Sequence, residues 1–245
     1  MISPAVHNGK TVDVVIPVYN EERDLPRCIT VLRPFLKEHL GDGGWRILVA
    51  DNGSTDNTLK VAQGLARQYP EVSYLHIPEK GRGRALKQAW LGSQADIVSF
   101  MDVDLSTGLG AFPQLLQALD QGNDLAIGSR YQPTSRVRRS WLRAVLSRSY
   151  NLLLKVLFWP PFADAQCGFK AARRTVAQEV LPLVKNPTWF FDSELLLRAR
   201  KSGYRIKEVP VEWHEDPDSR VGLSRAILGM MLEALRLRWA LWWGG

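Results

Sequence analysis

Short apolar runs rich in β-branched residues alternate with longer helical segments along the first half of this chain. Five of these runs have the length and composition of strands: residues 11–18, 45–50, 72–77, 97–101 and 124–128. Between them the sequence predicts a helix over residues 22–40, one capped by Ser54 or Thr55 that ends near residue 69, one that ends near residue 92, and one over residues 110–121. This alternation favours an α/β fold with a Rossmann-like, mostly parallel twisted sheet flanked by helices.

The second half of the chain has a different pattern. After a polar, arginine-rich loop it predicts a helix over residues 140–159, a short helix after residue 170, a helix from residue 191, a strand over residues 204–211 and a charged loop over residues 214–220. A last amphipathic helix is expected over residues 224–243, with apolar side chains at helical spacing: Leu228, Met231, Leu232, Leu235, Trp239 and Trp242. We therefore expect a flexible tail over residues 1–10, one domain over residues 11–220, and a C-terminal amphipathic helix over residues 221–245.

Two aspartates, Asp102 and Asp104, directly follow the fourth predicted strand. Parallel sheets bind ligands at the carboxyl ends of their strands. Side chains at positions i and i+2 of an extended chain point to the same side, so these carboxylates can converge on one hard cation. Mg²⁺ takes one or two carboxylates and fills its other positions with water and substrate phosphates. An isolated Asp-x-Asp is more often a pair of solvated aspartates in a turn, so the prediction of a metal site also depends on the motifs around it.

The chain is basic, with a formal net charge of +7 at pH 7, which suggests an anionic partner. Basic residues gather between the fifth strand and the next helix: Arg136, Arg138, Arg139, Arg143 and Arg148. Phosphorylated substrates and anionic membranes fit this charge, whereas no recognition motif supports nucleic acid. Two apolar segments, residues 151–162 and 226–243, are interrupted by charges or prolines and are too short to span a membrane. They are expected to lie on a surface, and the second in a membrane interface.

The cysteine count points to a reducing compartment. Cys28 and Cys167 are far apart in the sequence, which is no disulfide framework, and the first residues do not form a signal peptide. A cytoplasmic location, at the cytoplasmic face of the membrane, is therefore expected.

Six motifs occur in one order between about residues 12 and 220. They are Pro17-Val18-Tyr19-Asn20-Glu21, Asp51-Asn52-Gly53-Ser54-x-Asp56, Gly81-x-Gly83-x-Ala85, Asp102-x-Asp104, Gly128-Ser129-Arg130-Tyr131 and Gln166-Cys167-Gly168-Phe169-Lys170. With these motifs the chain resembles the family 2 glycosyltransferases of GT-A fold, and within them the polyprenyl-phosphate group that includes dolichyl-phosphate glucosyltransferase and dolichyl-phosphate mannose synthase. The resemblance implies an inverting, metal-dependent hexosyltransferase that uses a nucleotide sugar and a polyprenyl or dolichyl phosphate.

The resemblance also implies roles for individual residues. The nucleoside would be held by Pro17, Tyr19, Glu21 and Asp51. Asp102 and Asp104 would hold Mg²⁺ or Mn²⁺ on the diphosphate, and Arg130 and Arg220 would contact phosphates. Two positions depart from the family pattern: Asn52 replaces the second acidic residue of its motif, and Ser106 replaces a glutamine that serves some mannose synthases as a third metal ligand. Ser106 is retained as a weaker candidate metal ligand.

The basic stretch from Lys80 to Arg84 contains two glycines. Their spacing matches neither a P-loop nor a dinucleotide fingerprint, so it predicts a helix start beside the donor instead.

The acceptor decides whether the reaction needs a general base. A phosphate monoester is mostly dianionic at neutral pH and needs none, whereas a sugar hydroxyl does. Asp192 is the candidate catalytic base or acceptor-binding residue, and the alternative is an acidic residue favoured at a helix N-terminus. Arg130, Arg136, Arg138 and Arg139 are the candidates for the acceptor phosphate, with membrane headgroups as an alternative for the last three.

The motif from Gln166 to Lys170 looks more like that of the glucosyltransferases, so UDP-glucose is the preferred donor and GDP-mannose the second. One alternative function is a soluble family 2 glycosyltransferase with a saccharide or small-molecule acceptor. Another is a non-catalytic module that binds a nucleotide sugar and regulates a membrane partner.

Overall fold

The computed structural model describes residues 9–214 and 223–243 of the 245-residue chain. Most of the predicted tail, the charged loop after His214 and the predicted phosphate ligand Arg220 therefore lie outside the described residues, as does the side chain of Trp242. Among the described residues, no helix combines the length and the apolar character needed to cross a bilayer.

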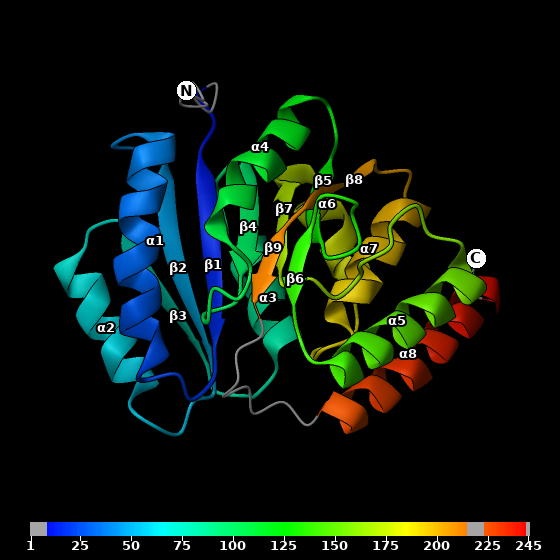
Figure 1. Cartoon of the computed structure of the whole chain (residues 1–245). Helices are drawn as coiled ribbons and strands as arrows, with labels where there is room; N and C mark the ends of the chain where they lie inside the picture. The colour runs from blue at the N-terminus through cyan, green and yellow to red at the C-terminus, as the bar shows by residue number, and fades with distance from the viewer. Residues whose placement is uncertain (1–8, 215–222, 244–245) are drawn as a thin grey trace.

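A seven-stranded sheet in the order β3-β2-β1-β4-β7-β5-β8 forms the centre of the molecule (Figure 1). Its strands are β1 (Val12–Val18), β2 (Trp45–Asn52), β3 (Val72–Ile77), β4 (Ile97–Met101), β5 (Leu125–Ser129), β7 (Phe169–Arg173) and β8 (Ile206–Pro210). All neighbouring pairs are parallel except those of β7, which runs antiparallel to both β4 and β5. The predicted mostly parallel sheet is confirmed.

Three strands were not predicted. β7 is a short, alanine-containing run without β-branched residues, so only its position between β4 and β5 makes it a strand. β6 (Arg136–Arg138) and β9 (Glu212–His214) pair with each other in a separate two-stranded sheet. The arginine-rich segment and the start of the predicted charged loop therefore lie side by side.

The carboxyl ends of β1, β2, β3, β4 and β5 lie at one edge of the sheet, where the antiparallel β7 begins. Val18 pairs with Asp51 at that edge, and Met101 pairs with Phe169. Residues from five of the six motifs therefore meet around the ends of neighbouring strands.

Helices cover both faces of the sheet (Figure 1). The helices α1 (Asp24–Leu40), α2 (Thr58–Gln68) and α4 (Phe112–Asp120) pack on one face. The 3₁₀ turn η1 (Leu109–Ala111) precedes α4. The helices α3 (Arg82–Leu91), α6 (Arg174–Val180) and α7 (Phe191–Lys201) pack on the other face of the sheet. The 3₁₀ turn η2 (Leu181–Leu183) follows α6. α5 (Trp141–Phe158) and α8 (Leu223–Trp243) pack on each other beside this second group.

The predicted cap of α2 is wrong. The helix begins at Thr58, whose backbone N–H and hydroxyl both donate to Asp56 Oδ1. Ser54 instead accepts a hydrogen bond from the backbone N–H of Asn20, 3.0 Å away, and ties the loop after β2 to the loop after β1. These polar side chains therefore organise the loop after β2 before the helix starts.

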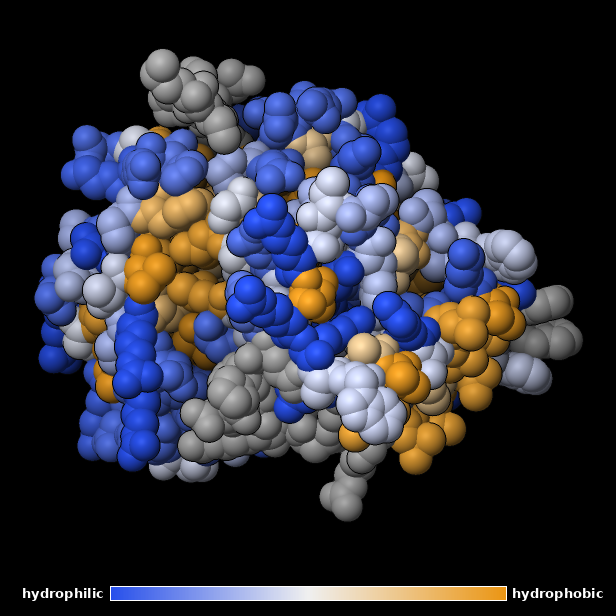
Figure 2. Space-filling view, viewed as in Figure 1, coloured by the Kyte–Doolittle hydropathy of each residue, from blue (hydrophilic) through white to orange (hydrophobic). Residues whose placement is uncertain are grey.

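α5 and α8 expose large apolar side chains although both also contribute to the core. On α5 the exposed set is Trp141, Leu142, Val145, Leu152 and Val156, with Trp159 directly after the helix, and on α8 it is Leu228, Leu232, Leu235 and Trp239. Figure 2 shows hydrophobic atoms gathered over these two helices at the right of the view. We call these ten residues the α5–α8 apolar surface. α8 also buries Met230, Ala234 and Leu237, so it is apolar on two sides.

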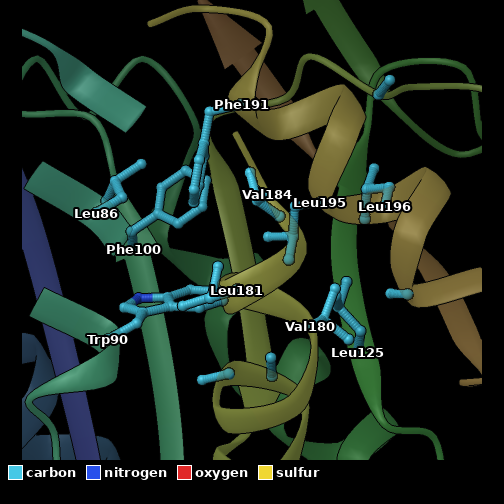
Figure 3. Close-up of a cluster of buried hydrophobic side chains, with 14 of the residues drawn as sticks. Leu86, Trp90, Phe100, Leu125, Val180, Leu181, Val184, Phe191, Leu195 and Leu196 are labelled. Atoms are coloured by element: carbon cyan, nitrogen blue, oxygen red, sulfur yellow. The ribbon is translucent and has the colours of Figure 1, made fainter. Parts of the chain in front are cut away.

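A cluster of buried side chains joins α3, β4 and α7 (Figure 3). Leu86 and Trp90 of α3 pack beside Phe100 of β4, and Phe191 at the start of α7 lies next to them. Gly83 allows this approach, because a Cβ there would lie 2.5 Å from the Cβ of Phe191. The packing therefore brings the N-termini of α3 and α7 together at the carboxyl end of β4.

Candidate active site

The Asp102–Asp104 segment forms a turn. β4 ends at Met101, and the backbone N–H of Leu105 donates to the carbonyl of Asp102 at 3.1 Å. The premise that both aspartates sit on an extended chain is therefore wrong. Asp102 keeps 44% of its side chain exposed, and Asp104 is exposed and accepts a hydrogen bond from the backbone N–H of Ser106 at 2.9 Å. Both carboxylates remain at the predicted sheet edge.

Arg82, the first residue of α3, lies at the centre of the site. Its Nη2 donates to Asp102 Oδ1 at 2.8 Å, and its Nη1 donates to Asp192 Oδ2 at 2.6 Å. Burial lowers the pKa of the guanidinium, but the charges of Asp192 and Asp102 raise it by more, so the net shift is upward. The sequence predicted a helix start here, and α3 confirms it, but the bridging role of Arg82 was missed.

Asp192 lies between two cations. Besides Arg82, the ammonium of Lys170 is 3.0 Å from Asp192 Oδ1, and the Lys170 side chain has no exposed surface. Lys170 also donates to the carbonyl of Cys167 at 2.5 Å. Asp192 is in the first turn of α7, as expected, but its side chain is only 6% exposed and takes part in this charged network.

The Gln166–Lys170 motif reaches the site because β7 begins at the same sheet edge. Gly168 packs directly against Asp102, since a Cβ at position 168 would lie 1.7 Å from Asp102 Oδ2. Two residues later, Lys170 faces Asp192. The motif therefore supplies both a close backbone approach and a buried cation.

The predicted nucleoside residues lie at the ends of β1 and β2. Pro17 is buried opposite Ala50 in the sheet, and Tyr19 has the ammonium of Lys80 3.7 Å from the centre of its ring. The backbone N–H of Glu21 donates to the Thr58 hydroxyl at 2.7 Å. Asp51 is fully buried, so any nucleoside contact would use a carboxylate already held by the protein.

His76 is the partner of Asp51 that sequence reasoning missed. Its Nδ1 lies 2.6 Å from Asp51 Oδ2, and the two residues are register partners in β3 and β2. The only sequence signal was a polar residue near the end of an apolar strand.

The side-chain hydrogen bonds of Asn52 give a reason for its departure from the family pattern. Its Nδ2 donates to the carbonyl of Val18 at 2.7 Å, and its Oδ1 accepts from the backbone N–H of Gly81 at 3.1 Å. An aspartate could accept the second bond but could not donate the first. Asn52 therefore ties the end of β1 to the loop that begins α3.

Arg130 is held by an acidic partner. Its Nε donates to Asp164 Oδ2 and its Nη2 to Asp164 Oδ1, both at 2.8 Å, and the Asp164 side chain is fully buried. Burial raises the pKa of Asp164, but the charge and hydrogen bonds of Arg130 lower it by more, so its net pKa is below the ordinary value. The side-chain hydrogen bonds to Asp164 use Nε and one Nη2 hydrogen, which leaves the two hydrogens of Nη1 and the second hydrogen of Nη2 for a phosphate.

The remaining candidates have structural contacts. The carbonyl of Ser106 accepts from the backbone N–H of His214 at 2.9 Å. Cys28 and Cys167 are free and buried, and burial raises the pKa of each thiol to about 12. In the part of the chain that the structure describes, no group of three or more His, Cys, Asp or Glu residues is arranged to hold a metal. Two carboxylates, rather than a complete protein cage, are thus the available donor set.

Comparison with known proteins identifies related chains. The family model described as "Glycosyl transferase family 2" matches residues 13–181. Glycosyltransferase AglD of Haloferax volcanii is 35% identical over 95% of this chain, which spans 38% of the length of that relative. The polyprenol monophosphomannose synthase of Mycolicibacterium smegmatis is 34% identical, and the match covers 91% of this chain and 83% of that relative. The dolichyl-phosphate beta-glucosyltransferase of Saccharomyces cerevisiae is 28% identical, and the match covers 93% of this chain and 74% of that relative.

The fold also has solved counterparts. A crystal structure of glucosyl-3-phosphoglycerate synthase from Mycobacterium tuberculosis, in complex with Mn²⁺, UDP and phosphoglyceric acid, superposes with a TM-score of 0.67. The two sequences are 22% identical, and the match covers 94% of this chain and 80% of the other. The architecture is thus shared at low sequence identity, which fits the GT-A fold.

Proposed function

This chain belongs to glycosyl transferase family 2, and on that basis we propose that it transfers a hexose from a nucleotide sugar to the phosphate of a polyprenyl phosphate. The relatives named dolichyl-phosphate beta-glucosyltransferase and polyprenol monophosphomannose synthase support this acceptor class. Glucose from UDP-glucose is the preferred donor, and GDP-mannose is the second candidate.

The ion pairs of Asp192 with Arg82 and Lys170 are the main observation in favour of a phosphate acceptor over a hydroxyl acceptor. A general base has to take up a proton, and protonated Asp192 would leave two buried cations without their shared counterion. A phosphate acceptor avoids this step, because its oxygen is already an anion at neutral pH. A hydroxyl acceptor would need a base at this place.

The two carboxylates after β4 fit a divalent metal that is shared with the substrate. Mg²⁺ and Mn²⁺ prefer oxygen ligands, and Mg²⁺ commonly binds one or two carboxylates together with substrate phosphates. Asp102 and Asp104 would be these ligands, with Ser106 as the weaker third candidate. When bound, the metal would supply a positive charge to the leaving diphosphate.

The chain's own residues would place the two substrates. Asp51, held by His76, and Tyr19 would bind the nucleoside at the ends of β1 and β2. The acceptor phosphate oxygen would form its bond to the anomeric carbon as the bond to the diphosphate breaks, which inverts that carbon and releases a nucleoside diphosphate. Lys170, Arg82 and the Nη1 of Arg130 would offset the negative charge where the two anions meet.

Transfer into a lipid product tests the proposal. The protein is incubated with Mg²⁺, polyprenyl phosphate and radiolabelled UDP-glucose or GDP-mannose in parallel, and label is counted in the organic phase. We expect label from one donor only, and none after chelation of the metal. Label that appears only in a water-soluble product would favour the saccharide-acceptor alternative. Intact donor binding without any turnover would favour the regulatory module.

The α5–α8 apolar surface would place the active site at the membrane, where a polyprenyl acceptor lies. Ten exposed large apolar residues, nine on two adjacent helices and Trp159 directly after one of them, are unusual for a surface that faces only water. Arg136, Arg138 and Arg148 are exposed beside them and suit anionic headgroups. The free, buried cysteines fit a reducing compartment, so we place this contact at the cytoplasmic face.

Charges placed in the α5–α8 apolar surface are expected to weaken vesicle binding. Leu232→Glu and Trp159→Glu each bring a carboxylate to a position where insertion into lipid requires an apolar side chain, so each should lower the partition coefficient at least about tenfold. Flotation with phosphatidylglycerol-containing vesicles measures this. Val31→Glu is the matched control for Leu232→Glu, because Val31 is 52% exposed and Leu232 51%, but Val31 lies on α1. Equal flotation of all four proteins would contradict the membrane contact. Deletion of α8 is a poorer test, since it would uncover core residues.

A further inference from the structure

We propose that Arg82 is a positioning residue that makes metal binding depend on the nucleoside diphosphate. In the absence of donor, its guanidinium holds Asp102 and Asp192 together and disfavours a divalent cation on Asp102. The inference rests on the proposed function, because it assigns Asp102 to the metal.

One oxygen of Asp102 is bound to Arg82, and the other is packed against the backbone of Gly168. Oδ1 accepts from Arg82 Nη2 at 2.8 Å, and Oδ2 lies against Gly168, where no side-chain atom could fit between them. A metal that binds Asp102 has to share this carboxylate with a guanidinium. Like charges that share one ligand repel each other, so Arg82 weakens the site for a free cation.

Arg82 is held firmly enough to have this effect. Its side chain is 11% exposed, its second carboxylate partner Asp192 is 6% exposed, and the rings of Phe100 and Trp189 lie 5.0 and 5.5 Å from its guanidinium carbon. Lys170 on the far side of Asp192 adds a second buried positive charge. The four charged side chains Arg82, Lys170, Asp102 and Asp192 sum to zero, so of the two proposed metal ligands only Asp104 adds negative charge from outside this network.

A nucleoside diphosphate changes this balance. Its phosphates add negative charge beside Asp102 and supply the oxygen ligands that the protein lacks, since the described residues contain no third acidic or histidine ligand for a metal there. Metal and nucleotide are therefore expected to bind cooperatively, and by linkage each raises the affinity for the other by the same factor. Arg82 is the residue that keeps the metal affinity low until the nucleotide arrives.

The test is a titration with Mn²⁺, monitored by electron paramagnetic resonance, without nucleotide and with UDP or GDP, the diphosphates of the two candidate donors. Wild-type protein should bind Mn²⁺ at least tenfold more tightly with the nucleotide than without it. Arg82→Met removes the charge and keeps an apolar stem beside Phe100, so without nucleotide it should bind Mn²⁺ at least tenfold more tightly than wild type. The factor by which the nucleotide raises the Mn²⁺ affinity should therefore be smaller in Arg82→Met than in wild type.

Asp192→Asn should shift the affinity the other way. It removes one carboxylate, so that Asp102 is the one remaining charged partner of Arg82 among the described residues, and it should weaken Mn²⁺ binding without nucleotide. Arg84→Met is the matched control. Arg84 lies on the same helix turn as Arg82, but its carboxylate partner is the exposed Glu79, 3.8 Å away, so this variant should not change the Mn²⁺ affinity. Melting temperatures report whether each variant is folded.

Unchanged Mn²⁺ affinity in folded Arg82→Met, or shifts of the same sign in the Arg82 and Asp192 variants, would overturn the inference. This outcome is distinct from failure of the proposed function, because the titration without nucleotide needs no transfer, whereas the proposed function fails when wild-type protein labels no lipid.

Discussion

Gly168→Ala is expected to lower kcat/KM for hexose transfer at least about 100-fold while leaving the protein folded. The new Cβ would lie 1.7 Å from Asp102 Oδ2, and real Cβ contacts are essentially never shorter than 3.0 Å. Asp102 has to give way, because its carboxylate is 44% exposed and the backbone of β7 is fixed in the sheet. Its movement breaks the ion pair with Arg82 and displaces a proposed metal ligand.

The measurement is steady-state transfer together with a thermal melt. Gly64→Ala is the matched control, since Gly64 lies inside α2 and a Cβ added there would meet no neighbouring atom within 4 Å, so this variant should be fully active and more stable by up to about 1 kcal/mol. Near-normal transfer by Gly168→Ala would contradict the proposed placement of Asp102 in catalysis.

Arg130→Met is expected to cost about 3–5 kcal/mol in the free energy of unfolding at pH 7. Asp164 has a fully buried side chain, and Arg130 neutralises it through two hydrogen bonds. Without the guanidinium, a carboxylate remains in the interior. Among the described residues it then keeps hydrogen bonds from the backbone N–H groups of residues 130 and 166 and the more distant charge of Lys170. Urea unfolding of both proteins measures the loss.

The pH dependence of this loss has a definite sign. In wild type the pKa of Asp164 lies below its ordinary value of 3.8, so its ion pair stabilises the fold above that pH and is lost as the pH falls through the folded-state pKa. In Arg130→Met, burial without the guanidinium raises the pKa of Asp164, so the folded variant takes up a proton at a higher pH than the unfolded chain. The stability difference between the two proteins should therefore shrink as the pH is lowered from 7 towards 4.

Two further variants separate this pair from surface effects. Arg130→Met combined with Asp164→Asn removes both charges and should recover much of the lost stability. Arg136→Met is the exposed control, because its ion pair with Glu212 is in solvent, and it should change stability by less than about 1 kcal/mol. A small loss in Arg130→Met, unchanged between pH 7 and pH 4, would contradict a buried ion pair and would leave Arg130 available for phosphate.

The sequence alone determined that the chain forms a mostly parallel sheet, and at which edge of the sheet the candidate site lies. Apolar strands that alternate with helices leave few arrangements other than a mostly parallel sheet, and polar residues at the strand ends then have to share one edge. Asp51, Asp102 and Arg130 follow directly from this rule, because each stands at or just after the end of a strand. The motifs identified the family for the same reason, since they mark these strand ends and the loops that face them.

Only the tertiary structure decided which charges meet. Arg82 and Asp192 are 110 positions apart, and Arg130 and Asp164 are 34 apart, so no local pattern connects either pair. The contacts exist because β7 inserts antiparallel between β4 and β5, and because Gly83 lets α3 approach the start of α7. Strand order and helix packing depend on the balance of burial over the whole chain, whereas periodicity reports only the local environment of each segment. For this reason the sequence located the candidate ligands, and the fold showed that Arg82 and Asp164 already bind several of them.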